Sequence, residues 1–141
     1  MALAMSDIQI GGEINCPLFC GRIETLRDIA EKQKWFVIYE MLKEEGISAR
    51  VINMATIKPL DNDLVIKAAK ETGAIVTAEE HSVIGGLGSA VCDALCKSCP
   101  TPVYKIGMQD RYGESGPAAE LVKKYKLDAD GVYEQVKEFL K

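Results

Sequence analysis

The residues of this chain that are best suited to chemistry lie in the stretch TAEEHSVIGGLGSAV, from Thr77 to Val91. Two adjacent carboxylates, Glu79 and Glu80, precede His81, which is the only histidine of the sequence. A histidine titrates near neutral pH, and beside carboxylates it can act as a general acid or base. No motif pairs His81 with a nucleophile, so we interpret it as a hydrogen-bonding residue of a polar turn. We expect no catalytic residue in this chain.

The same stretch contains three glycines, Gly85, Gly86 and Gly88, which suggest phosphate binding as a second possible function. A glycine-rich turn that opens a helix can hold a phosphate with backbone N–H groups, in spacings such as GxGxxG or GxxxxGK[ST]. The sequence GGLG has neither spacing, and the glutamates before it would repel a phosphate. We therefore predict that the glycines permit a tight turn and close packing of a helix on a sheet. We expect no cofactor-binding residue in this chain.

Cysteines form a third pattern, because Cys92, Cys96 and Cys99 have the spacing C-x3-C-x2-C, which can belong to an iron–sulfur site. Cys92 and Cys96 are four residues apart in a helical pattern, so we interpret them as buried thiols that act as small hydrophobes. Cys16 and Cys20 add little to a metal site, and we predict none. Five cysteines form no even disulfide framework, which predicts free thiols in the reducing cytoplasm.

Composition limits the class of protein. A chain of 141 residues with 48% hydrophobic residues predicts a single globular domain, 1–141, with one substantial core. The net charge of −4 argues against a nucleic-acid partner. No run approaches the roughly 18 apolar residues of a membrane span, so we expect no membrane partner. Residues 1–6, MALAMS, are too short for a secretory signal and read as a remnant of cloning.

Buried strands and amphipathic helices alternate from Gly46 onward and must position these residues. Three nearly continuous apolar runs, Ala49–Met54, Ala74–Glu79 and Val103–Met108, predict strands that are buried on both faces. The helix between the first two has Asp61 as its predicted N-cap and Gly73 as its C-cap. Short connections predict a parallel sheet with helices on both faces. The turn EHSVIG then follows a strand's carboxyl end, where open α/β sheets bind ligands.

The sequences INMATIKPLD, VTAEEHSVIGGLGS and GESG, in this order, resemble the C-terminal domain of transketolase. The similarity is strongest to the C-terminal subunit of split bacterial and archaeal transketolases, and it runs from about Glu44 to the end. Deoxyxylulose phosphate synthase and the β subunits of 2-oxoacid dehydrogenases such as pyruvate dehydrogenase are more distant relatives. The resemblance implies a three-layer α/β/α domain with a five-stranded, mostly parallel mixed sheet whose first strand is antiparallel.

The resemblance also implies a function, namely transfer of a two-carbon ketol unit between sugar phosphates in the pentose phosphate pathway. In that family, thiamine diphosphate and a divalent metal lie between two other domains, and neither fits in 141 residues. The resemblance thus implies that Glu79, Glu80 and Glu114 are not the cofactor-activating glutamate. It implies as partners an N-terminal transketolase subunit, or the missing N-terminal domains, and a homo-oligomer. The turn and interface candidates are Glu80, His81, Gly85, Gly86, Gly88, Gly113, Glu114 and Ser115.

Residues 7–40 are atypical for the family, which expects two strands followed by a helix. Asp7–Gly21 can be laid on the two strands, although Pro17 removes a hydrogen-bond donor from the second. Arg22–Gly46 reads as one long helix or two, and its run WFVIY either contacts a partner or forms a strand. Two other functions stay open: a free-standing module for dimerisation or small-ligand binding, and a fragment of deoxyxylulose phosphate synthase or of a 2-oxoacid dehydrogenase β subunit.

Overall fold

The computed structural model describes residues 2–6, 26–54 and 56–141, of which 2–6 and 26–33 are described by their backbone alone. Strands and helices alternate from Ser48 to Met108, as the sequence predicts, and two further helices follow. The elements in chain order are β1 (Ala2–Ser6), α1 (Leu26–Glu44), β2 (Ser48–Ile52), α2 (Asn62–Thr72), β3 (Ala74–Ser82), α3 (Leu87–Ser98), β4 (Val103–Met108), α4 (Ala118–Lys124) and α5 (Ala129–Phe139).

The described strands form one sheet in the order β2-β1-β3-β4. Strand β1 is antiparallel to both of its neighbours, whereas β3 and β4 are parallel. Because β2 and β3 both run opposite to β1, the strands β2, β3 and β4 all point the same way. Their carboxyl ends therefore lie on the same side of the sheet, which we call its carboxyl edge. The loops that follow the three strands all leave the sheet there.

The described sheet differs from the expected one in its first part. Strand β1 is antiparallel to both neighbours, as the resemblance implies for the first strand, and it lies inside the described sheet. Residues 2–6, which the sequence suggested as a cloning remnant, form this strand and pair on both sides. The described residues contain four strands rather than five, and only one of the three pairings is parallel. The predicted strands in 7–21, with Cys16 and Cys20, lie outside the described residues.

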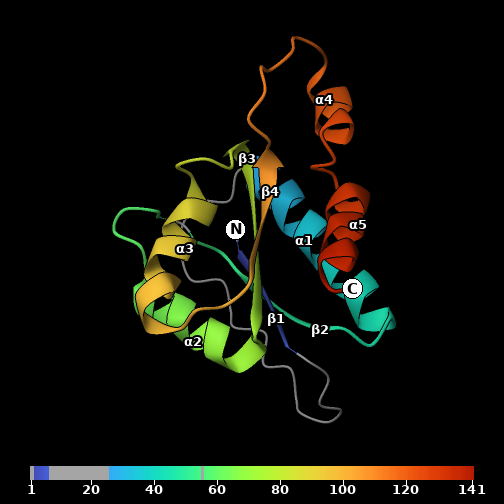
Figure 1. Ribbon diagram of the computed structural model, residues 1–141. Coiled ribbons are helices and arrows are strands. Elements are labelled where there is room, and N and C mark those ends of the chain that lie inside the picture. Colours follow the sequence, from blue (N-terminus) through green and yellow to red (C-terminus); the bar gives the residue numbers. More distant parts are fainter. Residues whose placement is uncertain (1, 7–25, 55) are drawn as a thin grey trace.

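Helices cover both faces of the sheet, so the three-layer α/β/α class is confirmed (Figure 1). Helices α2 and α3 pack on one face, and α1 and α5 pack on the other. Alternate side chains of β3 serve the two cores, since Ile75 packs with α2 and α3 while Val76 and Ala78 pack with α1 and α5. The fully buried side chains that fill the two layers include Ile38, Leu42, Val91, Leu95, Ile106, Val132 and Val136.

The run WFVIY belongs to helix α1, so the strand alternative is wrong. Trp35, Ile38 and Leu42 are buried against α5 and the sheet, and their spacing of three and four residues is the reason that one helix face can bury them. Phe36 and Val37 lie between them in the sequence and are exposed. The described residues contain no helix that is long and apolar enough to cross a membrane.

Candidate functional site

Strand β3 is longer and less regular than the sequence predicted. It continues to Ser82, so only residues 83–86 form the turn. Ala78 pairs with Ile106 and Ser82 with Met108, which means that four residue steps along β3 match only two along β4. This bulge lies at the two glutamates and the histidine. A bulge of this kind bends the end of the strand and changes the directions of its side chains.

Gly107 of β4 lies opposite the bulge, and sequence reasoning missed it. A Cβ atom at this position would lie 2.8 Å from the carbonyl oxygen of His81 and 3.0 Å from that of Glu79. Both distances are shorter than ordinary contacts, so the backbone of β3 can approach β4 only because residue 107 has no side chain. The signal that could have identified it is a glycine in the interior of the run VYKIGM.

The carboxylate of Glu79 closes the N-terminus of helix α3. Its Oε2 accepts a hydrogen bond from the backbone N–H of Leu87 at 2.8 Å, and its Oε1 accepts one from Gly88 at 3.1 Å. The residue before the helix, Gly86, has no side chain to do this. The first N–H groups of a helix need acceptors, and a negative charge is favourable there. The chain's own carboxylate thus occupies the place where a phosphate would bind.

Each glycine of the turn has its own physical reason. Gly85 has a φ of +75°, which favours glycine. Gly86 has a φ of −91°, so a positive φ does not explain why this residue is glycine. A Cβ atom at this position would instead collide with the carboxylate of Glu79, because the Cδ of Glu79 would be 2.7 Å away. A Cβ at Gly88 would lie 2.7 Å from Oγ1 of the buried Thr77 on β3. Tight turning and close packing, as the sequence predicted, thus apply to different glycines.

Ser89 fixes the turn from the first turn of α3. Its Oγ accepts hydrogen bonds from the backbone N–H of Gly85 at 3.0 Å and from Nζ of Lys105 at 3.2 Å, and it donates to the carbonyl oxygen of Val83 at 3.3 Å. The serine therefore links both sides of the turn to β4. Sequence reasoning missed this role because one of the three partners, Lys105, is 16 residues away in the sequence.

Glu80 and His81, which lie in the bulge, are exposed. The Nδ1 of His81 lies 3.2 Å from the carbonyl oxygen of Ser82, which is a hydrogen-bonding distance to the neighbouring backbone. The interpretation of His81 as a hydrogen-bonding residue stays a prediction.

An open groove of about 340 Å³ runs between the turn and the segment that follows β2. Its apolar side chains come from Met54, Ile57 and Leu87, and its acidic ones from Glu79 and Glu80. Among the described residues that line it, none is a lysine or an arginine. Chemically, the groove can accept an apolar group that adjoins a cation or a hydrogen-bond donor. The lining residues are Met54, Ile57, Glu79, Glu80, His81, Gly85, Gly86 and Leu87.

Comparison with known proteins identifies the family. The model of the family "Transketolase, C-terminal domain" matches residues 33–132 of the chain, well over half of its length. The chain belongs to the transketolase C-terminal domain family. The match begins within α1 and therefore leaves out most of the atypical segment 7–40.

Relatives with known names support this membership. An apulose-4-phosphate transketolase subunit of Phocaeicola vulgatus is 46% identical over 101 residues, which cover 72% of this chain and 32% of that protein. A 1-deoxy-D-xylulose-5-phosphate synthase of Chlorobium luteolum is 45% identical over 100 residues, 70% of this chain and 16% of that enzyme. A solved structure described as "Split gene transketolase, inactive beta4 tetramer" is 51% identical with a TM-score of 0.70, and the match covers 77% of this chain and 35% of that one. The chain spans about a third or less of these relatives.

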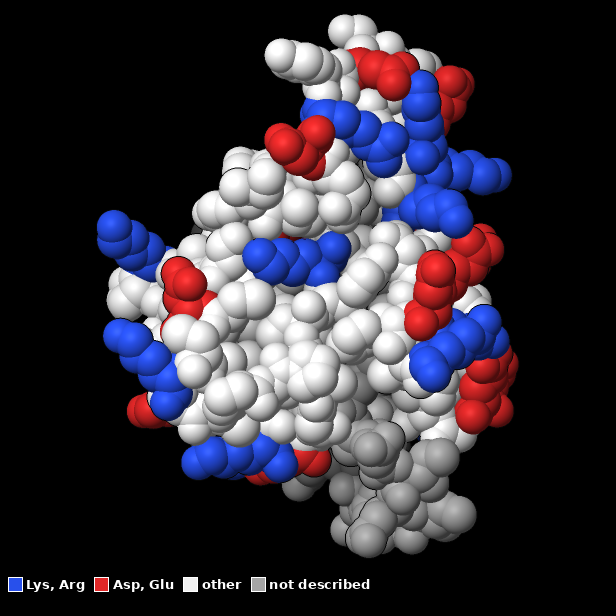
Figure 2. Space-filling model, viewed as in Figure 1, with Lys and Arg blue, Asp and Glu red and all other residues white. Residues whose placement is uncertain are grey.

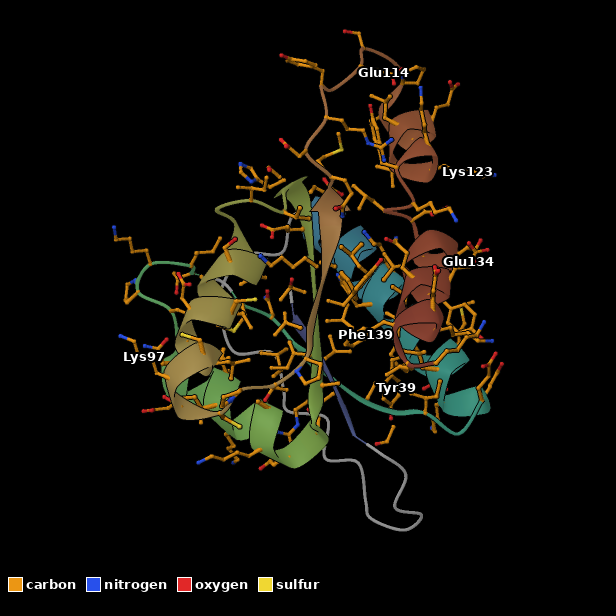
Figure 3. The ribbon with its side chains drawn as sticks, viewed as in Figure 1. Tyr39, Lys97, Glu114, Lys123, Glu134 and Phe139 are labelled. Carbon is orange, nitrogen blue, oxygen red and sulfur yellow. The ribbon has the colours of Figure 1, made fainter. Side chains whose placement is uncertain are left out.

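In this transketolase C-terminal domain, the GESG residues do not line the groove. Gly113, Glu114 and Ser115 lie in the exposed loop between β4 and α4, and Figure 3 places Glu114 next to α4. Its carboxylate accepts a hydrogen bond from Nζ of Lys124 at 2.5 Å. This bond and the charge of Lys124 lower the pKa of Glu114, and the same bond raises the pKa of Lys124. Glu114 thus ties the loop to α4 and is not part of the groove wall that Glu80 and His81 form.

The cysteines of the domain are only partly as predicted. Cys92 and Cys99 are half-buried, but Cys96 is exposed, so the prediction of a buried thiol is wrong there. The physical reason is that Cys96 directly follows Leu95, which takes the buried position on α3. Sγ of Cys96 donates instead to the carbonyl oxygen of Asp93 at 3.2 Å. Within the described ranges, no three His, Cys, Asp or Glu residues are grouped to hold a metal ion.

Proposed function

We propose that this chain supplies the C-terminal domain of a thiamine-diphosphate-dependent transketolase, which transfers a two-carbon ketol unit between sugar phosphates. Its contribution is assembly with the parts of the enzyme that hold the cofactor. The observation that carries this proposal is the position of the Glu79 carboxylate at the N-terminus of α3. Family membership and relatives named as transketolase subunits supply the enzyme class.

Among the described residues, those at the start of α3 do not fit thiamine diphosphate. Its diphosphate would need free N–H donors or cations, but the N–H groups of Leu87 and Gly88 already donate to Glu79. Glu80 stands beside that carboxylate on the groove wall and adds a second negative charge. A divalent metal would need grouped ligands, and the described part of the chain offers no such group. We therefore assign the cofactor and its metal to the partner, either an N-terminal transketolase subunit or the domains that such a subunit contains.

Two alternatives each have one observation in their favour. The similarity to a 1-deoxy-D-xylulose-5-phosphate synthase is nearly as high as that to the transketolase subunit, so the chain could serve that enzyme instead. A related split transketolase is described as an inactive tetramer of one subunit type, which favours a module that self-associates without chemistry. Assays with the substrates of each enzyme distinguish the synthase from the transketolase. Measuring the oligomeric state of the chain alone tests whether it self-associates.

The test mixes the full chain with the cognate thiamine-binding part of the enzyme, prepared without its own C-terminal domain. We expect ketol transfer between sugar phosphates from the mixture and from neither part alone. Formation of 1-deoxy-D-xylulose 5-phosphate in place of ketol transfer would move the chain to the synthase. A mixture that forms a stable complex but catalyses neither reaction would contradict the proposal.

A further inference from the structure

Exposed apolar residues follow each of the three strands that point the same way. Ile57 follows β2 and is 45% exposed, Ile84 follows β3 and is 62% exposed, and Tyr112 follows β4 and is 98% exposed. Because the carboxyl ends of these strands share one edge, the three residues lie in loops that leave the sheet at that edge. We call Ile57, Ile84 and Tyr112 the carboxyl-edge surface. Large apolar side chains left exposed in loops at one edge of a sheet are typical of a surface that a partner covers.

The groove supplies a charge preference to this surface. Ile57 lines it, Ile84 stands in the adjoining turn, and the carboxylates of Glu79 and Glu80 form its acidic wall. An acidic wall next to an apolar floor is complementary to a lysine or arginine that neighbours an apolar side chain. The groove is open, whereas sites for small molecules enclose most of the ligand, so a protein segment fits it better.

The arm that follows β4, residues 109–120, gives an independent reason. All of its residues are exposed, and helix α4, which begins within it, has no buried residue. A helix this short needs tertiary packing, and α4 has it through Val122, which packs on the core between the sheet and α1 and α5, so the part of the arm left uncovered is residues 109–120. Figure 2 shows lysine and arginine side chains gathered around α4, where Arg111 stacks 5.1 Å above the ring of Tyr125. The arm itself carries Asp110, Glu114 and Glu120 against the single Arg111, so it offers a partner the exposed ring of Tyr112 rather than positive charge.

We propose that the carboxyl-edge surface docks the thiamine-diphosphate-binding part of the enzyme. A segment of that partner places an apolar side chain on Ile57 and Ile84 and a lysine or arginine against Glu79 and Glu80. The arm around Tyr112 then packs on the same partner. This inference rests on the proposed function, because it names the surface by which that function is assembled.

The test compares two pairs of variants that are matched in exposure. Ile57→Asp and Ile84→Asp change the carboxyl-edge surface, while Val37→Asp and Phe36→Asp change the exposed residues of the run WFVIY on α1, which are 46% and 65% exposed and are the competing candidate for partner contact. Affinity for the thiamine-binding part is measured by calorimetry, and circular dichroism verifies that every variant is folded. We expect the dissociation constant to rise at least about tenfold for the edge variants and to change less than about twofold for the α1 variants. Added salt should weaken the wild-type complex, because charges contribute to it.

Four results would overturn the docking proposal. One is unchanged affinity of the edge variants, and another is an equal loss of affinity in the α1 variants. The third is that the edge variants dissociate an oligomer of this chain while partner affinity stays the same, which would make a second copy the occupant. The fourth is the absence of any complex. A complex that depends on Ile57 and Ile84 but shows no ketol transfer would overturn the proposed function alone.

Discussion

Helices α2 and α3 pack together on one face of the sheet, but their N-termini are stabilised in different ways. The cap of α2 is local, because Asp61 directly precedes the helix and accepts from the backbone N–H of Leu64 at 3.0 Å. The cap of α3 comes from Glu79, which lies eight and nine residues before the groups it binds and belongs to strand β3. One helix is therefore capped by its own sequence and the other by the sheet.

This difference shows what a distant cap can do that a local one cannot. Asp61 stabilises only the start of α2, whereas Glu79 also fixes the path of the turn between β3 and α3. It brings a carboxylate to the groove wall and requires glycine at residue 86, where a side chain would displace it. The long-range cap thus builds the candidate site and closes it to phosphate at the same time.

Gly86→Val should have the largest effect, because its Cβ would take the place of the Glu79 carboxylate. We expect a loss of about 1 to 3 kcal/mol in the free energy of unfolding, from lost hydrogen bonds and overpacking. Urea denaturation measures it. Gly113→Val is the matched control, since a Cβ there meets no atom within 4 Å, and it should be nearly neutral. Equal midpoints for the two variants would refute the close-packing explanation.

Glu79→Gln should come next, with a loss of about 1 to 2 kcal/mol, because the amide keeps one acceptor oxygen but loses the charge and the second acceptor. Thermal unfolding measures it, and Glu138→Gln on the exposed face of α5 is the control. Combined with Gly86→Ala, the two losses should be clearly less than additive, since both remove the same contact. Full additivity would mean that Gly86 acts independently of Glu79.

Asp61→Ala should cost about 1 kcal/mol, which is typical of a lost local N-cap. This variant sharpens the comparison, because it should leave affinity for the thiamine-binding part unchanged while Glu79→Gln weakens it. Calorimetry on both variants separates the two kinds of cap. If Asp61→Ala weakened that affinity as much as Glu79→Gln does, the distinction between the caps would fail.

The smallest effect concerns an exposed long-range carboxylate, Glu45, which accepts from Nζ of Lys137 at 2.6 Å and from the hydroxyl of Tyr133. Hydrogen bonds from Lys137 and then Tyr133 lower the pKa of Glu45. A lowered carboxylate pKa stabilises the fold above the unfolded value and loses this contribution as the pH falls through the folded one. Glu45→Gln should therefore lower the melting temperature slightly at neutral pH, and the difference from the wild type should disappear as the pH falls below about 4.3. A difference that stayed the same at acid pH would contradict it.

Features whose signals are local could be predicted from the sequence. Asp61 and Gly73 stand directly at the ends of α2, and both caps were predicted correctly: Asp61 accepts from Leu64, and Gly73 has a φ of 78° with its N–H donating to Ala69. The strands around Ile75 and Ile106 were also predicted, because burial on both faces leaves a continuous apolar run. The motifs from residue 52 onward identified the family, which the family match confirms.

Features that depend on distant contacts could not be predicted. The role of Glu79 requires the bulge opposite Gly107 and the path of the turn, which no local pattern encodes. Residues 2–6 pair with β2 and β3, which come much later in the chain, so their place inside the sheet had no local signal. The exposure of Phe36 beside the buried Trp35 followed only once the helix was known.

The most direct test of the account titrates thiamine diphosphate with Mg²⁺ into the full chain by calorimetry. Because Glu79 already accepts from the N–H groups of Leu87 and Gly88, the account predicts no detectable binding by the wild-type chain. The same titration into its complex with the thiamine-binding part should show binding with one cofactor per site. Tight binding of thiamine diphosphate to the chain alone, lost on Gly86→Val, would contradict the central claim that this domain assembles the enzyme without holding its cofactor.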